Sequence, residues 1–358
     1  MSEYDYGNAR LRARKSRLLS QHDLELLSET GSLQSLITAL LRTPYRKSIE
    51  TALARITGID CITEALRNDL VESMKTIHGF YAGNASEMIA MVMRYYDIHN
   101  LKAILRGLGK NVAPGEIIPT LLPIGDLSYN LLADVARAQS PRIAIDLLAS
   151  MNYPIVHPLL KLRVARPGAD TFEMEMALEQ WYFQEARKDL PGEDEAEQLL
   201  LSALNMDADL TNLLVVLRFV ADPAEKRLLQ QRLGTDRLSS LFVGPGRLSF
   251  KLLTQAGEQD LLLSALTILE GSVFSSALKS GYQAYTQTGR LSSLEKSLHR
   301  YRLSWMVQWI AKDPLGLGVF LGYLALKISE IANIRWIARG INLGLTPDIL
   351  RSELDFTA

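Results

Sequence analysis

The chain has 358 residues, of which 47% are hydrophobic and 22% charged, a composition typical of a packed protein rather than a disordered one. Its 39 basic and 40 acidic side chains nearly balance, which argues against a nucleic-acid binder that works by neutralising phosphates. The single cysteine, Cys61, excludes an internal disulfide, and we expect it to be a buried, inert thiol.

Apolar residues recur at helical spacing along the chain, first in residues 33–41 and again in residues 199–204. Helix starts are predicted where a capping residue precedes a proline, at Ser140-Pro141, Asp222-Pro223 and Thr346-Pro347. Residues 153–164 have some strand character, but their two prolines predict an extended connection. No apolar segment reaches the ~20 residues that a membrane helix needs, and no signal peptide is expected. These features predict an all-α chain.

One pattern occurs three times: an acid, an asparagine three residues later, and an arginine six residues after that, with aliphatic residues between them. The copies are Asp97, Asn100 and Arg106; Asp209, Asn212 and Arg218; and Glu330, Asn333 and Arg339. Successive copies are separated by well over the roughly 20–50 residues of a solenoid unit. The repeating unit is therefore predicted to be a small domain.

A second marker, a glycine-led helix with a serine, recurs in residues 125–132 and 246–253. An aromatic residue, Tyr153 or Phe274, follows the glycine at the same distance in both copies, and the motif asparagine follows the aromatic residue at a second constant distance. In the first copy the interval from Tyr45 to its asparagine is shorter, and a glycine-led helix is missing at the corresponding place. We expect a shortened first unit, as in many terminal repeats, and domains at 1–124, 125–245 and 246–358.

Two interpretations of the repeated motif are open. In the structural one, the asparagine is buried and satisfies backbone groups of a loop, the acid holds the asparagine in place, and the aliphatic residues fill the core. In the other, the acids and arginines form a ring of contacts for a partner. Both can hold, because the asparagine can point inward while the arginine points outward.

Signatures of catalysis are weak. No Gly-x4-Gly-Lys-Ser/Thr phosphate loop occurs, and the five histidines are scattered without the spacing of metal ligands. Gly316, Gly318 and Gly322 resemble a dinucleotide-binding pattern only loosely, so packing or a hinge is expected. The carboxylates of Glu173, Glu175 and residues 193–195 are expected to be solvated charges in loop-like surroundings. We therefore predict no cofactor, no metal site and no enzymatic activity of the chain alone.

The strongest charge cluster is near the N-terminus and consists of Arg10, Arg12, Arg14, Lys15 and Arg17. Such a cluster is usually the solvated start of a helix. Alternatively it docks against an acidic partner or anionic headgroups, with Arg10, Arg14 and Arg17 as candidate contacts.

Motifs along the whole chain resemble those of the C subunit of the archaeal and bacterial V/A-type rotary ATPases, the counterpart of the eukaryotic d subunit. They are Tyr6-Gly7-Asn8-Ala9-Arg10, Leu41-x-Thr43-x-Tyr45, Tyr96-Asp97-x2-Asn100-Leu101-Lys102-x2-Leu105-Arg106, Leu294-Glu295, Gly322-Tyr323-Leu324 and Glu330-x2-Asn333-Ile334-Arg335-x-Ile337-x2-Gly340. The middle unit departs from this pattern, because Leu214 stands where the other two have Lys102 and Arg335.

The resemblance implies a funnel of three similar helical domains around a pseudo-threefold axis. It implies a non-catalytic rotor component, into which the axle made by the D and F subunits inserts and which sits on the cytoplasmic face of the proteolipid ring. ATP, metal and ion sites would belong to other parts of the complex.

Two other classes of function stay open at this point. One is a helical-repeat scaffold that binds peptide partners, which many short units would favour and three large ones disfavour. The other is an enzyme whose site is assembled from dispersed residues.

Overall fold

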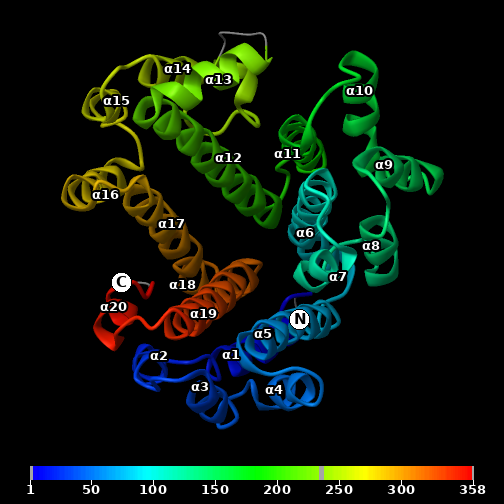
Figure 1. Cartoon of the computed structure of the whole chain (residues 1–358), viewed down its shortest axis with the longest axis vertical. Coiled ribbons are helices and arrows are strands. Elements are labelled where there is room, and N and C mark those ends of the chain that lie inside the picture. Colours follow the sequence, from blue (N-terminus) through cyan, green and yellow to red (C-terminus); the bar gives the residue numbers. More distant parts are fainter. Residues whose placement is uncertain (1–2, 234–237, 357–358) are drawn as a thin grey trace. The chain divides into compact units, whose positions relative to one another are not determined.

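The computed structural model describes residues 3–233 and 238–356, and in these residues all regular structure is helical (Figure 1). The all-α prediction is confirmed. From the N-terminus to residue 124 the helices are α1 (Asp5–Lys15), α2 (Gln21–Ser28), α3 (Leu33–Leu40), α4 (Arg46–Leu53), α5 (Gly58–His78), α6 (Gly83–Gly109), α7 (Pro114–Ile117) and the 3-10 helix Ile118–Thr120.

The next helices are α8 (Tyr129–Ala136), α9 (Pro141–Ser150), the 3-10 helix Pro154–Val156, α10 (His157–Ala165), α11 (Thr171–Lys188), α12 (Glu195–Ala221), α13 (Pro223–Leu233) and the 3-10 helix Leu238–Leu241. The remaining ones are α14 (Phe250–Gly257), α15 (Leu262–Ile268), α16 (Ser275–Thr288), α17 (Leu291–Val307), α18 (Trp309–Lys312), α19 (Gly318–Asn342) and α20 (Pro347–Ser352). The predicted starts at Pro141, Pro223 and Pro347 are confirmed.

The helices recur in the same order three times. Starting at α2, α8 and α14, each series has two short helices, a third helix of variable length, a longer helix, a helix of 25 or 27 residues with the motif, and a short last helix. The third series has one additional short helix, α18, and the 3-10 helices are left out of this comparison. Each series opens with an eight-residue helix whose N-cap is a serine, namely Ser20, Ser128 or Ser249. In all three, the serine hydroxyl accepts a hydrogen bond from the backbone N–H three residues later, which satisfies a donor that the helix cannot pair itself.

The sequence-based prediction for the first repeat is wrong in one respect, because its opening helix is present. The interval from Ser20 to Tyr45 equals the intervals from Ser128 to Tyr153 and from Ser249 to Phe274. Only the glycine is absent, since Arg17 occupies its position. The first repeat is therefore shortened after its aromatic residue and not at its start.

The chain forms two compact units, residues 1–103, 112–137 and 303–358 on one hand, and residues 104–111 and 138–302 on the other. In the first unit, the long helix α19 packs against α1, α2, α3 and α5, so the last repeat shares a core with the first helices of the chain (Figure 1). In the second, α12 packs against α11, α13, α14 and α15. This division follows contacts in space, whereas the domains predicted at 1–124, 125–245 and 246–358 follow the repeat in sequence and stay a prediction.

Helix α12 is the one helix of the described residues long and apolar enough, by length and composition alone, to cross a membrane. No such helix is expected from the sequence. Its Asp209 and Asn212 are fully buried and hydrogen-bonded to a loop, and it lies among four other helices of its unit. These contacts are those of a core helix.

Residues 153–164 were expected to be an extended connection, and this prediction is wrong. They form the 3-10 helix Pro154–Val156 followed by α10. Both prolines lie in the first turn of their helix, where the missing N–H leaves no hydrogen bond unmade.

Candidate functional site

The three motif asparagines lie on the long helices and are buried, with at most 4% of each residue exposed. Asn100 donates to the carbonyl of Leu122 and accepts from its N–H, both at 2.7 Å. Asn333 makes the same pair of bonds with Asp355, at 2.8 and 2.9 Å. Asn212 uses two neighbouring residues instead of one: it donates to the Gly244 carbonyl and accepts from the Val243 N–H, both at 2.9 Å. A side-chain amide offers the donor and acceptor of a peptide group, so each asparagine closes a loop over its helix.

The acids of the first two copies bind the loop rather than the asparagine, which differs from the prediction. Asp97 accepts from the N–H groups of Asp126 and Leu127, at 2.8 and 3.2 Å. Asp209 accepts from those of Arg247 and Leu248, at 2.9 and 3.0 Å. These amides immediately precede the capping serines of α8 and α14. Each acid therefore fixes the start of the next repeat.

Burial has an electrostatic consequence at these carboxylates. It raises the pKa of Asp97 to about 6, and the two backbone N–H groups offset only part of this effect. Burial likewise raises the pKa of Asp209.

The glycines of the second sequence marker allow this close approach. A Cβ atom on Gly125 would overlap the Asp97 carboxylate, and one on Gly246 would overlap that of Asp209. Any side chain there would displace the carboxylate from the amides that it binds. The glycine and the aspartate are therefore required together.

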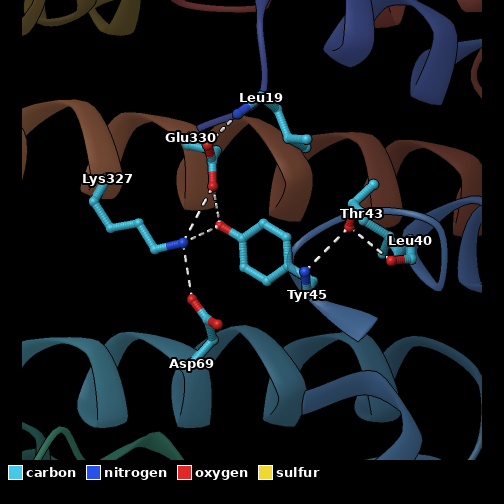
Figure 2. A network of polar contacts seen from close by, with 7 residues as sticks. All are labelled: Leu19, Leu40, Thr43, Tyr45, Asp69, Lys327 and Glu330. Atoms are coloured by element: carbon cyan, nitrogen blue, oxygen red, sulfur yellow. Dashed lines mark hydrogen bonds and ion pairs between the residues drawn. The ribbon is translucent and has the colours of Figure 1, made fainter. Parts of the chain in front are cut away.

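The third acid, Glu330, is one methylene longer and binds a segment distant in the sequence. It accepts from the Leu19 N–H at 2.7 Å and from the Tyr45 hydroxyl (Figure 2). Leu19 precedes the capping serine of α2, as Leu127 precedes that of α8. Here the position of the glycine is occupied by Arg17.

Figure 2 shows Tyr45 between α19 and α5, with Lys327 beside it. The Lys327 ammonium donates to the Tyr45 hydroxyl at 2.9 Å and to Glu330 at 3.2 Å. It also forms an ion pair with Asp69 on α5 at 2.8 Å. Burial lowers the pKa of Lys327, but the Glu330 and Asp69 carboxylates outweigh it, so the net shift is upward. Burial, followed by the same carboxylates, raises the pKa of Tyr45 well above its ordinary value.

The three clamps, each made of the motif acid and asparagine with the backbone that they bind, follow one order. Helix α6 holds the start of α8, α12 holds the start of α14, and α19 holds the segment before α2. Each long helix thus fixes the first helix of the following repeat, and the third fixes that of the first repeat.

The motif arginines are exposed, unlike the asparagines. Arg106 binds both carboxylate oxygens of Glu175 on α11, at 3.0 and 2.5 Å. Arg218 binds Glu295 on α17 at 2.9 Å. The expectation that Glu173 and Glu175 are solvated loop charges is wrong. Both lie on α11, and Glu173 is buried and caps that helix.

The arginines of the basic cluster near the N-terminus do not all lie on one surface. The guanidinium groups of Arg10 and Arg14, one turn apart on α1, both lie over the ring of Phe80, and Arg10 also lies over Tyr6. Arg12 donates to the carbonyl of Pro314. Arg17 lies beyond the end of α1 and is exposed. Of the three candidate contacts, only Arg10 and Arg14 share the Phe80 surface.

The remaining sequence candidates are structural in the part of the chain described. Cys61 is buried. A Cβ atom on Gly318 would lie 2.6 Å from the Trp309 carbonyl oxygen, and one on Gly322 would overlap the Ile310 side chain, so these glycines serve helix packing. Within residues 3–233 and 238–356, no group of three His, Cys, Asp or Glu side chains is placed to hold a metal ion.

The fold and the clamps define a class: an all-α protein of three similar helical repeats whose buried polar groups join one repeat to the next. The family model described as ATP synthase (C/AC39) subunit matches residues 7–353, and the chain belongs to this family. The resemblance seen in the sequence is thereby confirmed.

Individual relatives agree over nearly their whole length. The C subunit of the A-type ATP synthase of Methanocaldococcus jannaschii is 24% identical over 356 residues, which cover 99% of this chain and 86% of the relative. That of Pyrococcus abyssi is 25% identical over 97% of this chain and 89% of its own length. That of Methanococcoides burtonii is 25% identical over 99% and 94%. Membership supports a component of a rotary ATPase over the peptide scaffold and the dispersed-site enzyme.

Proposed function

We propose that this chain is a non-catalytic central-stalk subunit of a V/A-type rotary ATPase. In this role it is a socket that links the axle made by the D and F subunits to the proteolipid ring. It lies at the cytoplasmic side of the membrane as a peripheral part of the complex and transmits torque between ATP chemistry and ion transport. It binds no nucleotide, cofactor or nucleic acid.

The observation that carries this proposal is the set of three clamps. A part that transmits torque must not shear between its repeats, and at each junction here a buried motif acid accepts hydrogen bonds from backbone N–H groups of the next repeat. Leaving a buried polar group unpaired costs roughly 1–3 kcal/mol, so each junction resists opening. The proposed domains 1–124, 125–245 and 246–358 would surround a pseudo-threefold axis, with the clamps joining neighbours.

The decisive experiment compares ATP-driven ion transport in membrane vesicles from a deletion strain, with and without added purified chain. Without the chain we expect the soluble head to hydrolyse ATP while pumping is abolished, and we expect added chain to restore pumping. Undiminished pumping without the chain would show that it does not couple the two processes.

Arg10, Arg14 and Arg17 are proposed as partner contacts. Changing all three to Gln is expected to leave helicity unchanged and to weaken assembly most at low salt, where charges are least screened. Because only Arg10 and Arg14 share the Phe80 surface, a variant with these two changes should reproduce most of the loss. If variant and parent assembled identically at low and high salt, the cluster would be a solvated helix face without a partner contact.

A further inference from the structure

The three motif arginines are equivalent in sequence but not in their partners. Arg106 and Arg218 each bind a glutamate, Glu175 or Glu295, on the helix that precedes the next long helix. Each of these glutamates is the fifth residue of its helix, α11 or α17. The chain therefore contains two examples of the same arginine–carboxylate contact.

The third arginine has no such glutamate. Its counterpart of α11 and α17 is α5, which packs against α19 and has the buried Ile62 as its fifth residue. The nearby Glu64 is already paired with Arg55. Arg339 is exposed, and it forms no hydrogen bond or ion pair with any residue in the described part of the chain.

A second arginine strengthens the positive charge at this place. Arg335 lies one turn before Arg339 on α19, so the two side chains share a face of the helix. The Nε atom of Arg335 is buried and has no hydrogen-bond partner among the described residues. Burial, followed by the charge of Arg339, lowers the pKa of Arg335. Two adjacent guanidinium groups repel each other, and an anion bound beside them would offset this repulsion and accept hydrogen bonds from their unused donors.

We propose that Arg339, together with Arg335, is a docking site for a glutamate or aspartate side chain of a partner protein. Because the buried Ile62 fills the equivalent position on α5, the partner's carboxylate would approach the exposed Arg339 from outside and pair with it as Glu175 and Glu295 pair with Arg106 and Arg218. A protein carboxylate is favoured over a lipid phosphate because both internal examples are glutamates presented by a helix. The inference requires a complex with other ATP synthase subunits but does not require the socket role proposed above.

Arginine footprinting with phenylglyoxal tests the proposal on the intact chain. The free chain and the detergent-solubilised ATP synthase complex are labelled, and modification is measured by mass spectrometry. Complex formation is expected to slow the modification of Arg339 about fivefold, the factor that corresponds to a pair worth about 1 kcal/mol. Arg106 and Arg218, already paired, are internal controls with similar rates in both samples. An unchanged rate at Arg339 would overturn the proposal.

Variants give an independent readout. Arg339→Glu is expected to weaken binding of the chain to the rest of the complex about tenfold at low salt and less at high salt, with Arg339→Lys in between. Arg142→Glu, at an exposed arginine on α9, is the matched control and should bind like the parent. Equal binding of the Arg339→Glu and Arg142→Glu variants would contradict the proposal. Protection of Arg339 in the free chain by anionic phosphatidylglycerol vesicles, without protection in the lipid-free complex, would assign the site to lipid and overturn it as well.

Discussion

The clamp on α12 and the clamp on α19 use the same motif in different ways. At α12, a short aspartate reaches backbone amides beside a glycine, and the residues joined are 38 and 39 apart in sequence. At α19, a longer glutamate reaches the amide of Leu19, 311 residues away, and its carboxylate also binds Tyr45 and Lys327. In both clamps a motif acid binds backbone N–H groups before the next repeat. The acid is an aspartate beside a glycine at α12 and a glutamate within a larger polar network at α19.

Chain connectivity explains much of this difference. The cost of closing a loop grows with the logarithm of its length, and the longer separation at α19 adds about 2 kcal/mol. The loop before α14 is close to Asp209 in sequence. The segment before α2 and Glu330 lie near opposite ends of the chain. The network of Tyr45, Lys327 and Asp69 supplies additional contacts at this junction (Figure 2).

The largest effect is expected from breaking the α19 clamp with Glu330→Ala. This change leaves the Leu19 N–H without its acceptor and the buried Lys327 ammonium with less compensating charge, so the free energy of unfolding should fall by about 3–5 kcal/mol. Urea denaturation measures the loss, and Glu87→Ala at an exposed position of α6 is the control.

A double-mutant cycle then tests the coupling within the network. The combined Glu330→Ala and Lys327→Met variant should lose clearly less than the sum of the two single losses, because it leaves no unpaired ammonium. A loss below about 1 kcal/mol for Glu330→Ala would show that this network does not hold the junction.

The pH dependence of stability distinguishes the aspartate clamp of α6. The pKa of Asp97 is about 6 when folded and about 3.9 when unfolded, so between these values the folded state holds the proton more tightly. Stability from this group is therefore complete below about pH 4 and is lost as the pH rises through 6, by about 2–3 kcal/mol.

Comparison with Asp97→Asn isolates this contribution. In urea titrations between about pH 4 and pH 7, the stability of the parent relative to the variant should decline as the pH rises. The upward shift at Asp209 acts in the same direction and is present in both proteins. A difference that stays constant with pH would contradict the raised pKa of Asp97.

Replacing the asparagines tests whether the three clamps are equally important. Asn212→Leu keeps the volume but leaves the Val243 N–H and the Gly244 carbonyl unpaired, at a cost of about 1–3 kcal/mol. Asn333→Leu should cost less, since Asp355 is half-buried and water can reach its backbone, whereas Val243 is buried. Asn130→Leu, on the exposed side of α8, is the control. An unchanged denaturation midpoint for Asn212→Leu would contradict a structural role of the motif asparagine.

The sequence predicts the local features of this molecule well. Helical periodicity and proline-led starts depend on residues within a few positions of each other, and the all-α fold follows from them. The buried asparagine with its loop is also among the interpretations that the motif allows, because asparagine is the side chain that matches a peptide group.

Contacts between distant segments cannot be predicted in this way. Nothing local connects Glu330 with Leu19, Tyr45 or Asp69, so the sequence gives no sign of the network at α19. The opening helix of the first repeat is missed because its glycine is replaced by Arg17, although the constant interval from serine to aromatic residue is a usable signal. Glu173 is a different case, because its partners Asp170 and Arg166 are close in sequence and the capping box of Asp170 and Glu173 is a local signal of a helix start.

The smallest effect on stability is expected from substituting the glycine. It compares the aspartate clamp of α12 with the glutamate clamp of α19. Gly246→Ala places a methyl group on the Asp209 carboxylate and within 2.8 Å of the Asn205 carbonyl oxygen, so the carboxylate must leave its two amides. The expected loss in urea denaturation is about 1–2 kcal/mol. Arg17→Ala alters the equivalent sequence position of the first repeat, at an exposed residue, and should change stability by less than about 0.5 kcal/mol. If the two variants lost the same amount, the pairing of glycine with aspartate would not be the reason for the difference between the clamps.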